Sequence, residues 1–233
     1  MIDPIQLLIL QTLSGYITFL VTIIVTYTVL HKDRSYILNQ AFAVAIMALG
    51  LSSWAIGTSN LPYFVKIVGY DADAHMVFFI RLFYSFLVIS LIAFFFVTLI
   101  LESGNEIATN PFVITSLFLV ILMNILVIIL PDSIYVADIS VGNTETSLLF
   151  KVVFFGSAVI LYFLTFNNFY TVYKQTEGNT REGMKIFMIG WVVGGLALVL
   201  SVFSDFMREI DLVSQVLLAI GVIILSMGFK NSG

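Results

Sequence analysis

Seven long apolar runs, separated by more polar connections, two of them about 17 residues long, constrain this chain more than any other feature of its sequence. A helix needs roughly 20 apolar residues to cross about 30 Å of membrane hydrocarbon, and each run is close to that length. The runs therefore predict seven transmembrane helices in a single domain, residues 1–233. They cover about residues 5–30, 36–57, 75–101, 111–130, 148–173, 184–206 and 212–229.

The composition favours the same interpretation, because the chain has too few charged residues to form a surface for water. Asp, Glu, Lys and Arg make up 10% of the residues, 60% are hydrophobic, and the mean hydropathy is +1.08. Soluble domains carry about 25% charged residues. We therefore predict an all-α integral membrane protein, a multi-pass protein of the cell membrane surrounded by lipids.

The polar breaks predict the orientation of the bundle, because Lys and Arg are enriched in cytoplasmic loops. With the N-terminus outside and the C-terminus in the cytoplasm, six basic residues fall inside and four outside. Those inside are Lys32, Arg34, Lys174, Arg181, Lys185 and Lys230, and those outside are Lys66, Arg81, Lys151 and Arg208. In this orientation the segment Lys174–Lys185 is predicted to be a polar cytoplasmic loop.

The connection between the fourth and fifth runs carries a weaker signal for a strand pair. Ile134 and Val136 alternate with polar residues, and Gly142-Asn143 follows as a turn sequence. Such alternation beside a glycine-containing turn is typical of a β-hairpin. We expect a short hairpin at the outer side of the bundle.

Two familiar seven-helix classes do not fit. Rhodopsins bind retinal through a lysine in the middle of the last helix, and Leu212–Phe229 contains none. G-protein-coupled receptors end their third helix with an acidic-Arg-Tyr cluster, whereas the third run here ends with Leu101-Glu102-Ser103. Because a helix number alone does not carry function, neither activity is expected.

The positions of several aromatic and polar residues fit a third class of seven-helix protein better. Its marks are Trp54 in Leu51–Ala55, Arg81-Leu82-Phe83-Tyr84 and Phe94-Phe95-Phe96 in the third run, and Ser201–Phe206 and Leu217–Gly221 in the last two. In this spacing the chain resembles the seven-transmembrane N-terminal sensor region of prokaryotic histidine kinases and related signalling proteins. The resemblance implies a ligand site towards the outer face and no catalysis. It also implies an effector domain missing from this chain, or a separate cytoplasmic signalling partner.

Polar residues in the outer halves of several runs predict where a ligand would bind. Ionisable side chains inside a membrane usually face the bundle interior. Arg81 and Asp205 lie at similar depth, so they predict a charged floor to an outward-facing pocket, a structural salt bridge, or two side chains that reach the headgroups separately. Trp54 also has a simpler explanation as an interface residue. The candidate ligand-binding residues are Gln11, Ser53, Trp54, Arg81, Tyr84 and Asp205.

Other residues indicate helix packing. Asn124, deep in the fourth run, is typical of an amide that bonds to a neighbouring helix. Gly190 and Gly194 form a small-xxx-small spacing that lets another helix approach closely. The partner helix is either in the same bundle or in a second copy, which leaves a homo-oligomer open.

The sequence offers no set of residues for catalysis, a metal or a cofactor. It contains no cysteine, and His31 and His75 are predicted on opposite faces. No basic run suggests nucleic acid. We therefore expect a non-enzyme without a cofactor, which senses a small molecule or lipid near the outer face and signals to a cytoplasmic partner. The alternatives are a small-solute or lipid transporter or channel, and a structural membrane subunit.

Overall fold

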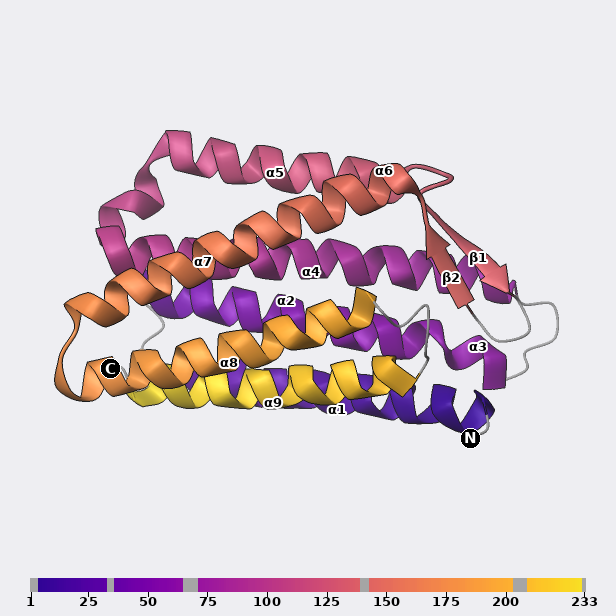
Figure 1. Ribbon diagram of the computed structural model, residues 1–233, viewed down its shortest axis with the longest axis horizontal. Coiled ribbons are helices and arrows are strands. Elements are labelled where there is room, and N and C mark those ends of the chain that lie inside the picture. The colour runs from indigo at the N-terminus through magenta and orange to yellow at the C-terminus, as the bar shows by residue number, and fades with distance from the viewer. Residues whose placement is uncertain (1–3, 33–35, 65–70, 139–142, 203–208, 232–233) are drawn as a thin grey trace.

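The computed structural model describes residues 4–32, 36–64, 71–138, 143–202 and 209–231. Long helices run side by side along the longest axis, and a small β-hairpin lies at one end (Figure 1). We call this end the hairpin end and the other the opposite end. Helix α1 begins at the hairpin end, and α9 finishes at the opposite end (Figure 1).

The long helices follow the predicted apolar runs. They are α1 (Pro4–Lys32), α2 (Ile37–Ser59), α4 (Ala72–Ser103), α5 (Pro111–Ile129), α7 (Gly156–Gln175), α8 (Gly178–Val202) and α9 (Glu209–Asn231). Within the described residues, seven helical segments are long and apolar enough to cross a membrane. The prediction of seven helices in an all-α bundle is therefore confirmed.

Short elements connect these helices. They are α3 (Leu61–Phe64), the 3₁₀ helix η1 (Asn105–Thr109), α6 (Leu148–Phe150) and a π-helical stretch, η2 (Lys151–Phe155), that leads into α7. The predicted start at Pro111 is confirmed, because the side-chain oxygen of Asn110 accepts from the backbone N–H of Phe112 at 3.0 Å. Pro111 has no backbone N–H, and at this first position of α5 a backbone N–H would have no partner within the helix.

The predicted hairpin is also present. Strand β1 (Ile134–Asp138) pairs antiparallel with β2 (Asn143–Thr146), and Tyr135 stands opposite Glu145. The Tyr135 hydroxyl donates to the Glu145 carboxylate at 2.9 Å. This bond raises the pKa of Tyr135, because the carboxylate stabilises the neutral phenol.

The predicted loop from Lys174 to Lys185 is wrong. Helix α7 continues to Gln175, and α8 begins at Gly178. The chain reverses at Gly178 with φ +60°, a conformation that glycine adopts without strain. Charged residues such as Arg181 and Lys185 are good helix formers, so the helix extends beyond its apolar part. The end predicted for the sixth run, residues 203–206, lies outside the described residues.

Small residues hold α8 and α9 together as an antiparallel hairpin. They recur every seven positions, at Gly183, Gly190 and Ala197 on α8 and at Ser214, Gly221 and Gly228 on α9. A Cβ on Gly190 would lie 3.1 Å from the Gly221 carbonyl oxygen, and one on Gly228 would lie 2.9 Å from that of Gly183. Ser214 Oγ donates to the Ala197 carbonyl at 2.7 Å. The two backbones therefore lie in direct contact.

Helices α1 and α2 pack in the same way. Small residues recur on α2 at Ala43, Gly50 and Gly57, again every seven positions. A Cβ on Gly57 would lie 3.0 Å from the Thr12 carbonyl, and Thr12 Oγ1 donates to the Gly57 carbonyl at 3.1 Å. Helix α1 also packs against α9, and Ser14 Oγ donates to the Gln215 side chain across that contact.

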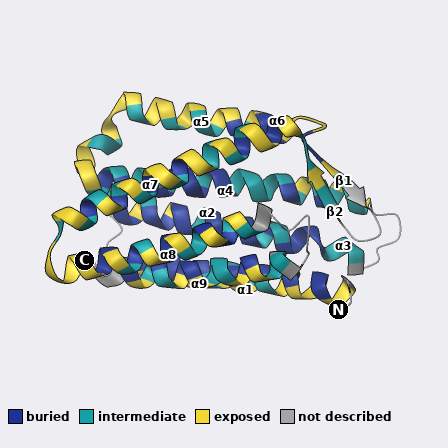
Figure 2. Ribbon diagram, in the orientation of Figure 1, coloured by how far each residue is buried: buried dark blue, intermediate teal, exposed yellow. Residues whose placement is uncertain are grey.

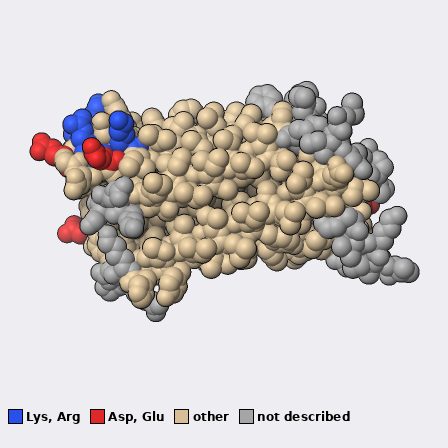
Figure 3. All heavy atoms as spheres, turned by 90° about the horizontal axis from the view of Figure 1, so that it is seen from below, with Lys and Arg blue, Asp and Glu red and all other residues tan. Residues whose placement is uncertain are grey.

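The outward surface is apolar over most of the bundle length. Large exposed side chains such as Phe112 and Phe118 on α5 and Phe163 on α7 face outwards, and α5 and α7 are largely exposed (Figure 2). On the face shown in Figure 3, Lys and Arg gather at the opposite end, and the middle of that face shows no charged residue. Such a belt suits lipid, since large exposed apolar patches are rare on soluble monomers.

Candidate functional site

Arg81 lies on α4 and bonds to the carbonyl end of α5. Its Nη2 donates to the carbonyl oxygens of Leu130 and Pro131, at 3.0 and 3.1 Å. Leu130 is the C-cap of α5, so the cation neutralises the partial negative charge at that helix end. Asp205 lies outside the described residues, and its pairing with Arg81 stays a prediction.

Tyr84 lies one turn further along α4 in a cluster of rings. Its centroid is 4.7 Å from Phe150 and 4.8 Å from Phe154, in edge-to-face geometry. Phe83 and Phe155 complete the cluster. These rings join α4 to α6 and η2.

Trp54, Ser53 and Gln11 lie elsewhere. Trp54 is half-buried between Phe19 of α1 and Phe79 of α4, with centroid distances of 6.5 and 5.5 Å. Ser53 is buried and donates to the Leu49 carbonyl at 3.1 Å, while Gln11 is buried on α1. Trp54 therefore lies at the contact of α1, α2 and α4.

Helix α4 separates the two groups. At 3.6 residues per turn, Arg81 and Tyr84 lie roughly 140–160° around α4 from Phe79, the ring that contacts Trp54. The predicted residues share a depth but not a side of the helix. The contacts of Trp54 and those of Arg81 and Tyr84 therefore lie on different sides of α4.

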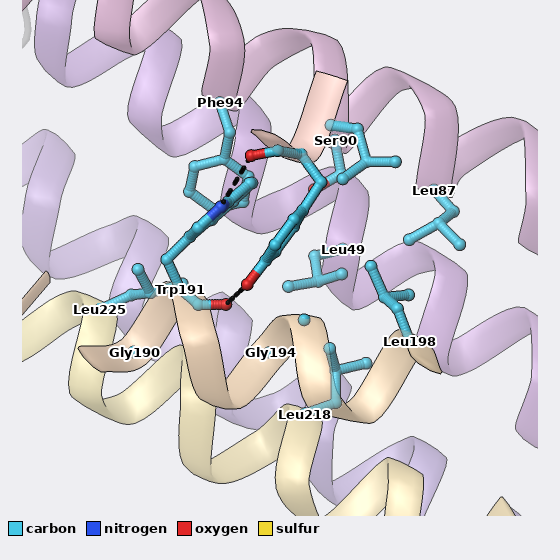
Figure 4. Close-up of a pocket in the computed structure, with 13 residues that line it drawn as sticks. Leu49, Leu87, Ser90, Phe94, Gly190, Trp191, Gly194, Leu198, Leu218 and Leu225 are labelled. Atoms are coloured by element: carbon cyan, nitrogen blue, oxygen red, sulfur yellow. Dashed lines mark hydrogen bonds between the residues drawn. The ribbon is translucent and has the colours of Figure 1, made fainter. Parts of the chain in front are cut away.

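A cavity lies deeper in the bundle, among α2, α4, α7, α8 and α9 (Figure 4). Its volume is about 30 Å³, which is room for roughly two groups of the size of a water molecule. Six of its thirteen lining residues are leucines, including Leu49, Leu87, Leu198 and Leu218, and Phe94 also lines it. This site was not predicted from the sequence.

Tyr162 of α7 and Trp191 of α8 form one wall of the cavity. Tyr162 Oη donates to the Trp191 carbonyl at 3.3 Å, and Trp191 Nε1 donates to the Tyr162 carbonyl at 3.4 Å (Figure 4). The rings stack with centroids 5.3 Å apart. A Cβ on Gly195 would overlap the Tyr162 ring, so this position of the ring requires glycine.

The two glycines predicted for packing differ in their surroundings. Gly190 contacts Leu225 and Gly221 of α9 through its backbone face. A Cβ on Gly194 would meet no atom within 4 Å, and this residue lines the cavity. Gly194 therefore leaves space that a larger side chain would fill.

Asn124 links two helices through its side chain. It accepts from Ser157 Oγ of α7 at 2.9 Å and donates to the Val120 carbonyl of its own helix, also at 2.9 Å. About three turns further along α7, Asn168 donates to Thr98 of α4 at 3.1 Å. Side-chain hydrogen bonds thus attach α7 to both neighbours.

The residues that line the cavity, which the sequence analysis did not predict, had a partial signal in the sequence. The heptads of small residues on α8 and α9 are visible before folding, and they indicate which face of α8 packs against α9. Trp191 stands in the middle of a run, away from the interface where tryptophan is enriched. Its partner Tyr162 could not be identified, because the crossing of α7 and α8 depends on the whole bundle.

Comparisons with known proteins add no assignment: no family model, no curated protein and no solved structure matches the chain. The resemblance to kinase sensor regions therefore stays a prediction. In the part of the chain that the structure describes, no group of three or more His, Asp or Glu residues is placed to hold a metal ion.

Proposed function

We propose that this chain is a multi-pass protein of the cell membrane that senses a small molecule or a lipid and signals to a cytoplasmic partner. In this proposal the N-terminus and the hairpin end are outside, and the opposite end is in the cytoplasm. The binding event displaces α7 relative to α8. The displacement is then passed to the α7–α8 turn and to whatever protein or domain contacts it.

The attachment of α7 is the observation that carries the proposal. Helix α7 meets α8 through rings and side-chain hydrogen bonds, with Tyr162 on Trp191 and Phe169 on Phe187 at 4.5 Å. Side-chain contacts of this kind can rearrange, whereas backbone contacts cannot without separating the helices. A ligand that prefers one arrangement shifts the population towards it.

The opposite end of α7 is suited to a partner. Lys174 lies over the Tyr170 ring at 4.3 Å, and Arg181 of α8 lies over Tyr173 at 4.8 Å. These cation–π contacts fix charged groups on both sides of the two-residue turn. Movement of α7 therefore changes the position of charges that a cytoplasmic partner can bind.

The transport alternative is less well supported. Ion or proton transport calls for ionisable groups along a path, or for interrupted helices near the middle of the membrane. Arg81, the charged residue farthest inside α4, caps α5, and the π-helical stretch η2 lies at the hairpin end of α7. The cavity is lined by leucines and rings, which offer no path to a polar solute.

The chain contains no cysteine, so a single introduced cysteine carries a reporter without background. Lys174→Cys, labelled with an environment-sensitive fluorophore in liposomes, would be screened against small molecules and lipids. We expect a compound that changes the fluorescence without crossing the membrane. Saturable uptake of a compound into the liposomes, with no change in the label, would support a transporter and contradict the sensor.

A further inference from the structure

The cavity lies at the depth of the membrane where only hydrocarbon is present. Leu49, Ser90 and Leu218 stand near the middles of α2, α4 and α9, and all three line the cavity. The middle of a spanning helix coincides with the middle of the hydrocarbon layer. Any ligand that reaches the cavity sideways comes from the acyl-chain region.

The lining selects the chemistry of that ligand. Its two side-chain hydroxyls are both used, since Ser90 Oγ donates to the Ala45 carbonyl at 2.8 Å and Tyr162 Oη donates to the Trp191 carbonyl at 3.3 Å. The indole N–H of Trp191 donates to the Tyr162 carbonyl at 3.4 Å, and the other lining side chains are apolar. A bound water needs two to four polar partners, so this space disfavours water and favours hydrocarbon.

The side of the cavity between α7 and α8 is thinly covered. Gly194 contributes no side chain there, and the Tyr162 ring, which covers Gly195, is itself only half-buried, as is Leu198. Beyond this level α7 diverges from α8 towards the hairpin end (Figure 1). Hydrocarbon can therefore approach Tyr162 from the surrounding lipid.

We propose that the cavity binds the end of a hydrocarbon chain between α7 and α8, with Tyr162 and Trp191 as the wall that it contacts. The chain end belongs either to a membrane lipid or to a free apolar molecule dissolved in the membrane. As the ligand site of the proposed sensor, this assignment rests on that function. The binding itself can be tested without any signalling readout.

Tryptophan fluorescence gives a direct test, because Trp191 lines the cavity and the chain has one other tryptophan. In a Trp54→Phe background, Trp191 is the sole reporter. Bromine atoms quench tryptophan at short range. One arm uses liposomes of phospholipid brominated near the chain end, and the second uses 1-bromohexane in unbrominated liposomes.

Two matched substitutions separate binding in the cavity from quenching by the surrounding lipid. Gly194→Leu fills the cavity, while Gly156→Leu adds the same side chain on the exposed side of α7, where a Cβ also meets nothing within 4 Å. Leu87→Ala, which enlarges the cavity, is a third variant. Circular dichroism checks that each variant keeps its helices.

We expect quenching of Trp191 to be about threefold weaker in Gly194→Leu than in Gly156→Leu, and strongest in Leu87→Ala, because short-range contact needs space beside the ring. A difference in the brominated-lipid arm assigns the site to lipid chains, and one confined to 1-bromohexane assigns it to free apolar molecules. Equal quenching in all three variants, in both arms, overturns the hydrocarbon site. That result would leave the proposed sensor function intact, with the ligand bound elsewhere. Hydrocarbon binding without any response of the Lys174→Cys reporter would instead contradict the sensor function.

Discussion

The α8–α9 hairpin and the α5–α7 side of the bundle are held together by different kinds of contact. In the hairpin, Gly190, Gly221 and Gly228 bring two backbones into contact. On the other side, α5 and α7 are joined by side chains, including the bond from Ser157 to Asn124. Burial differs much less than the kind of contact: in the most apolar stretch of each helix, 39% of α8 and 28% of α9 are buried, against 17% of α5 and 22% of α7.

This difference in contacts indicates which part of the bundle can move. Membrane helices gain little from the hydrophobic effect against one another, so packing and hydrogen bonds hold them. Backbone contact over several turns is lost all at once when the helices separate. A ring stack or a single amide bond can shift and form again. We therefore expect α1, α2, α8 and α9 to act as a frame and α7 as the mobile element.

The largest expected effect comes from breaking the frame at Gly228. A Cβ there would lie 2.5 Å from the Phe187 backbone nitrogen, so Gly228→Leu forces α8 and α9 apart. We expect a loss of about 3 kcal/mol or more in the free energy of unfolding. Thermal unfolding in detergent, followed by circular dichroism, measures it. Gly156→Leu is the matched control, and equal losses in the two variants would contradict the division into frame and mobile element.

Arg81→Ala should have the next largest effect, because it removes a charged donor from the end of α5. Hydrogen bonds to charged groups contribute about 1.5–3 kcal/mol, and we expect a loss of about 2 kcal/mol. Arg81→Lys should recover part of it, since one ammonium group cannot reach both carbonyls as well. An unchanged melting temperature in Arg81→Ala would leave Arg81 free for the ligand role predicted from the sequence.

Asn124→Leu tests the α5–α7 contact. It removes one interhelical bond, and Ser157 keeps a second acceptor in the Phe154 carbonyl at 2.9 Å. We expect a loss of about 1 kcal/mol, within the range for interhelical bonds in membranes. The same unfolding assay measures it, with Asn167→Leu on an exposed position as the control. A loss as large as that of Gly228→Leu would place α5 and α7 in the frame.

Tyr162→Phe removes one hydrogen bond and keeps the ring stack with Trp191. Because the Trp191 carbonyl retains its intrahelical bond, we expect a loss of only about 0.6 kcal/mol. The Trp191 emission spectrum, which reports on its surroundings, should change more clearly than the stability. An unaltered spectrum would show that the hydroxyl does not position the ring pair.

The smallest effect is expected outside the membrane, at Tyr135. The bond to Glu145 raises the pKa of this phenol, so the bond is complete at neutral pH and is lost as the pH rises through the raised value. A spectroscopic titration of tyrosinate, compared between the wild type and Glu145→Gln, measures the shift. Removing the carboxylate should return the pKa of Tyr135 towards its ordinary value of about 10.

Much of the fold could be predicted from the sequence, because hydrocarbon thickness imposes a length on every spanning helix. The seven runs, the β-hairpin and the start at Pro111 follow from such local rules. The start of α8 at Gly178 could not be predicted from hydropathy, since Arg181 and Lys185 are helical but not apolar. At these residues the helix extends beyond the apolar stretch that predicts the hydrocarbon layer.

The candidate site was harder to predict, because sequence gives depth in the membrane but not the neighbours around each helix. Trp54 and Arg81 were grouped by depth, yet α4 lies between their contacts. Gly190 and Gly194 share one motif, and the backbones of both lie against Gly221 of α9, yet only Gly194 leaves the position of a Cβ open. Such differences depend on crossing angles, which are set by contacts between distant parts of the chain.

The most direct test of the division between frame and mobile element is a pair of spin-label distances in liposomes. One pair of labels, at Ile160→Cys and Val199→Cys, measures the distance between α7 and α8. The other pair, at Val199→Cys and Val213→Cys, measures the distance between α8 and α9. All three positions are exposed. On addition of 1-bromohexane we expect the α7–α8 distance to shift by about 1–2 Å or more, as helices do in switching proteins, while the α8–α9 distance stays constant. An equal shift in both pairs, or a constant α7–α8 distance, would contradict the division into frame and mobile element.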